Sequence, residues 1–139
     1  MTNQKLLFLI LIISGILFSF RSFNFGTSGK EEKYIKTELF FGLNKPDGSK
    51  VTEEEWESFC DSVISKTFYK GATIMKSDGR WLSGDSLIKE ESRTVIYFSK
   101  IYEMTEEFSE KIDILREKYK LYYNQEAVLR TDDFINASF

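Results

Sequence analysis

Residues 35–43, IKTELFFGL, decide the fold, because they begin a pattern in which a strand leads into a helix. Leu39 and Phe41 fall on one side of an extended chain, and Glu38 and Phe40 fall on the other. Such alternation is typical of a strand that buries one face. The sequence therefore predicts a half-buried strand here, with Leu39 and Phe41 in the core.

A turn and a helix follow this strand. Residues 44–48 (NKPDG) combine turn-forming residues, and Thr52 followed by Glu55 is a capping-box sequence at a helix start. Trp56 then opens an apolar stripe at helical spacing. The sequence predicts a helix over residues 53–66, with Trp56 as a core residue.

The rest of the chain carries strand and helix signals in a different order. Three signals come first: a strand at residues 71–76, a tight turn at residues 78–79, and a strand in the later half of residues 87–99. Three more follow: an amphipathic helix of about five turns after Thr105, a short strand at residues 127–131, and a tail at residues 132–139.

The order of these elements is β-α-β-β-α-β. Two right-handed crossovers joined by a hairpin predict an α+β fold, the ferredoxin-like β-α-β-β-α-β plait. This plait is a four-stranded antiparallel sheet with two helices on one face. We assign it to residues 36–139, after a polar linker at residues 29–35. No segment is predicted to cover the other face of the sheet, which we call the open face.

An apolar segment precedes the linker. Residues 6–20 (LLFLILIISGILFSF) carry no charge and follow Lys5. This pattern predicts that residues 1–28 contain a hydrophobic helix, which is either a cleaved signal peptide or an N-terminal membrane anchor. As a helix the run covers ~22 Å, against a hydrocarbon core of ~30 Å. Both alternatives predict export, with membrane contact through residues 6–20 if the segment is not cleaved.

Composition excludes several classes of function. The chain has no histidine and a single cysteine, Cys60, so catalytic triads, histidine metal sites and thiolate zinc sites are excluded. We expect neither a cofactor nor a metal ion. The net charge is −3, and the basic residues form no continuous stripe, so we expect no nucleic-acid binding.

Strand alternation predicts a candidate site on the open face. It places five functional side chains there: Glu38, Phe40, Arg93, Tyr97 and Arg130. Two guanidinium groups match a carboxylate or phosphate, which predicts a small anionic ligand. The alternative is that Glu38 forms a cross-strand ion pair on a sheet that is solvated or buried in a homodimer.

The hairpin and the last junction carry further candidates. Glu90 and Glu91, beside Trp81 in the hairpin, could form an acid-base pair, because an indole wall raises the pKa of a carboxyl group. The alternative is that both are exposed glutamates at a strand end, which lie on opposite faces of a regular strand. Gln125 could bind backbone groups between the second helix and the last strand. Cys60 lies on the apolar stripe of the first helix, which predicts an unreactive buried thiol.

Several separated segments carry a family resemblance: residues 37–42 (TELFFG), 79–81 (GRW), 90–92 (EES) and 125–130 (QEAVLR). Over residues 37–139 the chain resembles the family catalogued as domain of unknown function 3574. The resemblance implies a small exported bacterial protein, often with a lipid anchor. This chain departs from that pattern because no cysteine follows its apolar run. The family has no agreed activity, so the resemblance assigns no catalytic residue.

Two classes of function follow. The first is an exported or membrane-anchored binding module that uses its open sheet face. The second is a small cofactor-free enzyme with a pocket between the facing sheets of a dimer. An enclosed pocket around an acid favours the enzyme, and an open face favours the binding module.

Overall fold

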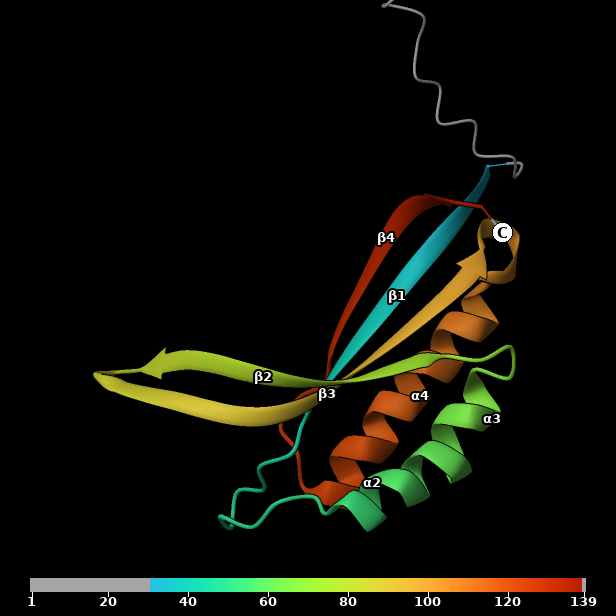
Figure 1. The fold of residues 1–139 in the computed structure, drawn as a ribbon. Helices are drawn as coiled ribbons and strands as arrows, with labels where there is room; N and C mark the ends of the chain where they lie inside the picture. The colour runs from blue at the N-terminus through green and yellow to red at the C-terminus, as the bar shows by residue number, and fades with distance from the viewer. Residues whose placement is uncertain (1–30, 139) are drawn as a thin grey trace, which may run out of the picture. The chain divides into compact units, whose positions relative to one another are not determined.

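The computed structural model describes residues 31–138, which form an antiparallel sheet with helices packed on it (Figure 1). The elements are β1 (Glu32–Gly42), α2 (Glu53–Phe59), η1 (Cys60–Ile64), α3 (Ser65–Thr67), β2 (Thr73–Ser83), β3 (Ser86–Lys100), η2 (Ile101–Glu103), α4 (Glu106–Tyr123) and β4 (Leu129–Ala137). The π-helical segment η1 joins α2 and α3 into one helical run.

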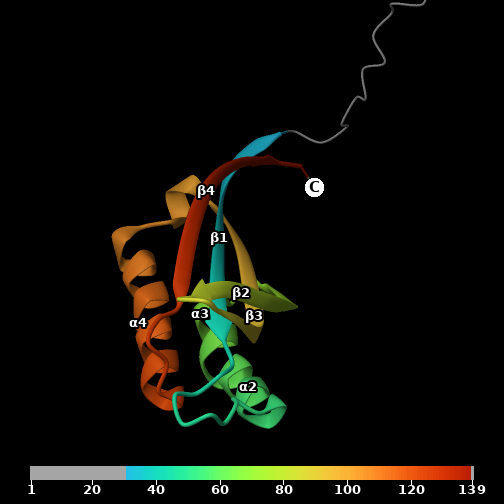
Figure 2. The ribbon, with the colours of Figure 1, turned by 90° about the vertical axis from the view of Figure 1, so that its left-hand side faces the viewer.

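The sheet has the predicted topology. Its strands lie in the order β2-β3-β1-β4, and each neighbouring pair is antiparallel. The helical run α2-η1-α3 and α4 lie on the same side of the sheet (Figure 2). An α+β fold with a four-stranded antiparallel sheet and two helices is therefore confirmed, in the element order of a ferredoxin-like plait.

The predicted N-terminal hydrophobic helix, and with it the signal peptide or anchor over residues 1–28, lies outside the described residues. Within residues 31–138, no helix combines the length and the apolar character needed to cross a membrane. β1 begins at Glu32, a few residues before the predicted strand.

The first helix starts as the sequence predicts. Thr52 Oγ1 accepts the N–H of Glu55 at 3.2 Å, and the Glu55 carboxylate accepts the N–H of Thr52 at 2.8 Å. This capping box satisfies two backbone donors that the helix itself leaves unpaired. The run continues to Thr67, one residue beyond the prediction.

Aromatic side chains form the centre of the core between the sheet and the helices. The ring of Phe41 from β1 lies 4.8 Å from the ring of Tyr119 and 5.4 Å from that of Trp56, both in edge-to-face geometry. Trp56 is 2% exposed, so its predicted core position is confirmed. Edge-to-face contacts stabilise beyond the burial of apolar area.

The two outer strands are longer than predicted. The predicted turn at Asp78-Gly79 is wrong, because β2 passes through it with Gly79 paired to Glu90. Residues 132–137 are not a tail, because β4 pairs with β1 as far as Ala137. The Asp78-Gly79 pair indicates a turn in isolation and Asp132-Asp133 indicate a tail, but charged residues are also common in edge strands.

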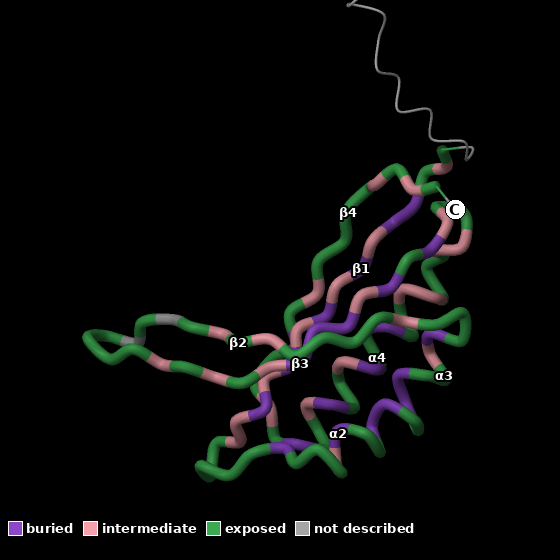
Figure 3. Tube along the Cα trace, in the orientation of Figure 1, coloured by how far each residue is buried: buried purple, intermediate pink, exposed green. Residues whose placement is uncertain are grey.

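The β2–β3 ribbon extends beyond the rest of the sheet. β1 stops pairing with β3 at Gly42, opposite Ser92, whereas β2 and β3 pair as far as Ser83 and Ser86. We call residues 78–91 the β2–β3 arm. Most of the arm is exposed, in contrast to the strand segments that face the helices (Figure 3).

Candidate functional site

The structure divides the five side chains predicted for the open face between the two faces of the sheet. Glu38 and Phe40 lie on the open face. The other three lie opposite buried residues of β1 and face the helices: Arg93 opposite Phe41, Tyr97 opposite Thr37, and Arg130 opposite Leu39. The prediction that Arg93, Tyr97 and Arg130 share the open face is therefore wrong.

The error is a shift of one residue in the alternation of β3 and β4. Such a shift moves every side chain of a strand to the opposite face. In β3, apolar residues occupy both positions of the alternation, with Val95 and Tyr97 on one face and Ile96 and Phe98 on the other. The core selects the first pair, since the ring of Tyr97 stacks on that of Phe68 at 4.6 Å.

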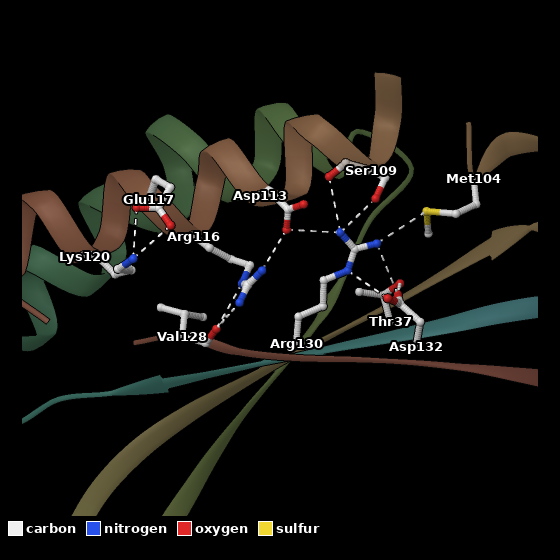
Figure 4. Close-up of polar contacts among 10 residues, drawn as sticks. All are labelled: Thr37, Met104, Ser109, Asp113, Arg116, Glu117, Lys120, Val128, Arg130 and Asp132. Atoms are coloured by element: carbon white, nitrogen blue, oxygen red, sulfur yellow. Dashed lines mark hydrogen bonds and ion pairs between the residues drawn. The ribbon is translucent and has the colours of Figure 1, made fainter. Parts of the chain in front are cut away.

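Arg130 connects β4 to α4 (Figure 4). Its Nη1 lies 3.0 Å from Ser109 Oγ and 3.3 Å from Asp113 Oδ1, both on α4. Its Nε donates to Asp132 Oδ2 at 2.9 Å, and Thr37 Oγ1 donates to the other oxygen of Asp132 at 2.6 Å. With its side chain 11% exposed, Arg130 acts as a structural link between sheet and helix.

Arg93 has a similar structural role at the first helix. Its Nη2 lies 2.6 Å from Glu53 Oε2, at the start of α2, and its side chain is 8% exposed. The hydrogen bond from Arg93 lowers the pKa of Glu53, against the opposing effect of desolvation. Arg93 and Arg130 therefore cannot bind an anion on the open face, and the anionic-ligand hypothesis loses its basis.

Glu38 does lie on the open face, where its carboxylate already has partners. Lys36 Nζ lies 3.1 Å from Glu38 Oε2, and Thr131 Oγ1 lies 3.5 Å from the same oxygen. The predicted cross-strand ion pair of Glu38 with an arginine is therefore wrong, because Glu38 pairs with a lysine of its own strand.

A groove of about 650 Å³ lies at one end of the open face, where β1 and β3 meet the loops before α2 and after α4. It brings together Phe40 and Glu90, which the sequence singled out separately. The lining consists of Phe40, Gly42, Asn44, Lys45, Pro46, Ile88, Glu90, Ser92, Asn124, Gln125, Glu126, Ala127 and Leu129. We call it the Glu90 groove. Three of the segments that carry the family resemblance contribute to it.

Glu90 is held in a fixed position in this groove. Its Oε1 accepts the backbone N–H of Asn44 at 2.9 Å. The carboxylate lies directly against Gly42, where an added Cβ would be 2.5 Å from Oε1. Only glycine at position 42 leaves room for this approach. The second oxygen, Oε2, forms no hydrogen bond with any of residues 31–138 and is free to meet a ligand.

The backbone around Glu90 is fixed by side chains from the second helix and its junction. Tyr119 Oη donates to the carbonyl of Gly42 at 2.8 Å, and burial raises the pKa of Tyr119, which keeps this donor protonated. Gln125 Nε2 donates to the carbonyl of Asn44 at 2.7 Å, as predicted for a residue that binds backbone groups. Sequence reasoning missed Gly42 and Asn44, because their role depends on contacts across the sheet.

The groove is acidic and apolar. Phe40, Ile88 and Leu129 provide apolar surface, whereas Glu90 and Glu126 provide carboxylates. Its one basic side chain, Lys45, is neutralised, because its Nζ lies 3.0 and 3.1 Å from the two carboxylate oxygens of Glu55. The arrangement suits a ligand with an apolar body and a cationic or hydrogen-bond donor group.

The acid-base candidates of the β2–β3 arm are divided between the two faces of the sheet. Trp81 and Glu90 take diagonal positions of the ladder on the open face, since Trp81 pairs with Ile88 and Glu90 pairs with Gly79, whereas Glu91 alternates to the other face. Cys60 is buried and free, and burial raises the pKa of its thiol to about 12, so it is unreactive as predicted. In the part of the chain that the structure describes, no three Asp, Glu or Cys side chains are grouped to hold a metal ion.

Comparison with a solved phage enzyme supports the fold. A phage SAM lyase in complex with S-methyl-5′-thioadenosine is 18% identical, with 76% of this chain and 90% of that chain covered and a TM-score of 0.53. The same enzyme in its apo state is 19% identical, with 76% and 89% covered and a TM-score of 0.51. CutA from Synechococcus elongatus PCC7942 is 11% identical, with 81% and 84% covered and a TM-score of 0.45. At such identities the likeness concerns the fold alone.

Comparison with protein families gives a more specific result. No curated protein matches the chain. The model of the family described as "Protein of unknown function (DUF3574)" matches residues 36–139, which is nearly the whole of the described structure. The chain therefore belongs to the DUF3574 family.

Proposed function

We propose that the protein is a binding module that takes a small molecule in the Glu90 groove of its open face. The observation that carries this proposal is the position of Glu90. Its carboxylate is fixed by the N–H of Asn44, and one oxygen is left to the groove. Oε2 is accessible from the groove, so a bound donor replaces water there and forms a charge-assisted hydrogen bond.

The groove has a carboxylate surface and an apolar surface, and the two together define the chemistry of the ligand. A cationic or N–H group binds Oε2 of Glu90, and an apolar body covers Phe40 and Leu129. Leu129 is 58% exposed, so its coverage removes apolar surface from water. The groove is open at this side, which favours a binding module over an enzyme that encloses its substrate.

Export is part of the same proposal. Lys5 and the uncharged run over residues 6–20 have the charge and hydropathy pattern of an exported N-terminus. Fractionation of the native protein tests this: we expect it in the membrane, the periplasm or the medium. Recovery in the cytoplasm with an intact N-terminus contradicts export but leaves the Glu90 groove untouched.

A panel of matched small molecules tests the ligand chemistry. Each amine is paired with a carboxylate of the same apolar body, for example phenethylamine with phenylacetate, and binding to the full chain is followed by calorimetry. We expect the amines to bind at least about tenfold more tightly, because only they pair with the free oxygen of Glu90.

Two variants test whether Glu90 is responsible for the preference for amines. Glu90→Gln removes the charge with little change in volume, and we expect it to abolish the preference for amines. Glu38→Gln is the matched control, since Glu38 lies on the same face but outside the groove lining. Equal binding of amines and carboxylates, or an unchanged preference in Glu90→Gln, contradicts the proposal.

A second candidate function is a small cofactor-free enzyme, in which Glu90 accepts a proton from a bound substrate. The phage SAM lyase with a similar fold was solved with S-methyl-5′-thioadenosine, and it supports this candidate only through the shared fold. Incubation of the full chain with SAM, with detection of S-methyl-5′-thioadenosine, tests it. Formation of this product by the wild type and not by Glu90→Gln favours the enzyme, and its absence favours the binding module.

A further inference from the structure

The β2–β3 arm carries like charges directly opposite one another. Asp78 lies opposite Glu91, and Arg80 lies opposite Lys89, in the β2–β3 ladder. All four side chains are exposed. Glu91 is balanced by Lys50, whose Nζ lies 3.0 Å away, but Arg80 and Lys89 form no ion pair with any of residues 31–138. Like charges in this position destabilise a ribbon.

The hydrogen-bond pattern brings these like charges close together. The N–H of Leu43 donates to the carbonyl of Glu91 at 3.0 Å, so the backbone groups of Glu91 point toward β1 and away from β2. Asp78 and Glu91 are therefore a non-hydrogen-bonded pair, in which side chains approach most closely. Arg80 and Lys89, two residues further along, are a pair of the same kind.

The same pattern leaves backbone N–H and C=O groups unpaired at the outer edge of β2, where another strand can pair with them. Because the backbone groups of Asp78 and Arg80 do not point toward β3, they point outward from the sheet edge. β2 is an outermost strand of 11 residues and contains no proline. A long edge strand with free N–H and C=O groups is a template for strand addition.

We propose that β2 pairs in antiparallel fashion with β2 of a second copy, about a twofold axis at Gly79. In this register Asp78 of each copy lies opposite Arg80 of the other, and the outward backbone groups of both residues face each other. The acidic pair of one arm then lies beside the basic pair of the other arm. Each row across the dimer thus runs from two acids to two bases, so that each repulsive pair of the monomer lies beside a pair of opposite charge.

The charged residues of β2 favour this register over registers with the twofold axis at a nearby residue. An axis at Asp78 places two acids opposite each other, and an axis at Arg80 places two guanidinium groups opposite each other. An axis at Ser77 pairs Lys76 with Asp78, but Lys76 already lies 3.5 Å from Glu53, and Arg80 stays unpaired. At Gly79 the axis also meets no side chain, so the two strands approach without a clash.

This interface is independent of the proposed ligand site. β2 contributes no residue to the lining of the Glu90 groove. A dimer through β2 leaves the open face accessible, and failure of either proposal does not affect the other.

Disulfide cross-linking of the full chain in detergent micelles tests the register. In a non-hydrogen-bonded antiparallel pair the two Cα atoms at the axis are about 4.5 Å apart, within disulfide range. We expect oxidised Gly79→Cys to run as a covalent dimer. Ser77→Cys is the matched control, because the two copies of residue 77 would be about 13 Å apart along the strands. The buried Cys60 of the wild type gives no cross-link.

A charge exchange tests the cause of pairing. We expect Asp78→Lys to weaken dimerisation at least about tenfold, measured by sedimentation, because it places a lysine of one copy opposite Arg80 of the other. The double variant Asp78→Lys, Arg80→Asp restores the opposite charges and is expected to restore the dimer. Monomeric Gly79→Cys, cross-linking of Ser77→Cys to the same extent, or no recovery in the double variant overturns the proposal.

Discussion

The two faces of the sheet use charged residues in opposite ways. On the helix side, the buried guanidinium group of Arg93 and the half-buried one of Arg130 are paired with carboxylates of the helices or of β4. On the open face, Glu90 has one oxygen paired with a backbone N–H and the other facing a groove. A charge with all its partners inside the protein stabilises the fold, whereas one with a free position can bind something else.

The comparison shows that the type of residue does not reveal its role. Two arginines are a better signal of ligand binding than one glutamate, since guanidinium groups match anions so well. The tertiary structure reverses that order, because helices cover the arginines and leave the glutamate open. The following predictions test how far the two faces differ, from the largest expected effect to the smallest.

Removal of a large core side chain from the helix side has the largest effect. We expect Trp56→Ala to lower the free energy of unfolding by about 3–5 kcal/mol, as deletions of buried aromatic residues do. Phe98→Ala, on the open face and 43% exposed, is the control and is expected to cost under about 1 kcal/mol. Denaturant melts measure both. Equal losses contradict the distinction between the two faces.

The loss of a half-buried arginine comes next. We expect Arg130→Ala to lower stability by about 1–3 kcal/mol, because Asp132 and the α4 groups lose their partner. Lys111→Ala removes an exposed ion pair with Glu107 and should cost under about 0.5 kcal/mol. Binding of amines at the Glu90 groove should be unchanged in both variants. Weaker binding of amines to Arg130→Ala would indicate that Arg130 contributes to the ligand site.

The Gly42→Ala variant distinguishes an effect on ligand binding from an effect on stability, because it adds a methyl group beside Glu90. The Cβ of Gly42→Ala would lie 2.5 Å from Glu90 Oε1, so the flexible carboxylate must move and lose its bond to Asn44. We expect a stability change of about 1 kcal/mol, the value of one such bond. Amine binding should fall as in Glu90→Gln. A variant with wild-type binding indicates that the position of the carboxylate is unimportant.

The smallest effect concerns pH. The hydrogen bond from the Thr52 N–H, followed by that from Lys45, lowers the pKa of Glu55. A lowered pKa in the folded state stabilises the protein above the ordinary range of Glu, and this contribution disappears as pH falls through the lowered value. We therefore expect Glu55→Gln to weaken the dependence of the melting temperature on pH between about pH 5 and pH 3.

Unchanged acid sensitivity in Glu55→Gln contradicts the assignment of a pH-dependent role to the capping box. The variant is a fair test, because glutamine keeps the side-chain oxygen that accepts the Thr52 N–H. The melting temperature near neutral pH serves as the reference for each protein.

Local rules placed much of the fold correctly. Thr52 and Glu55 form the capping box through two hydrogen bonds between residues that are three positions apart in the sequence. No distant part of the chain is needed for these bonds. The strand with Leu39 and Phe41 was assigned to the correct face, since its polar and apolar positions differ clearly. The element order then restricted the topology to a few arrangements, of which the ferredoxin-like plait is the one observed.

The sequence by itself determined the helix starts, the core role of Trp56 and the order of strands and helices, because these follow from contacts between near neighbours and from a clear period. Only the tertiary structure decided which face of β3 meets the helices, since both faces are apolar and a period of two does not distinguish them. It also decided the site. Glu90 meets Gly42 and Asn44 from a segment more than 40 residues away, through the pairing of β1 with β3, and no local pattern encodes that distance.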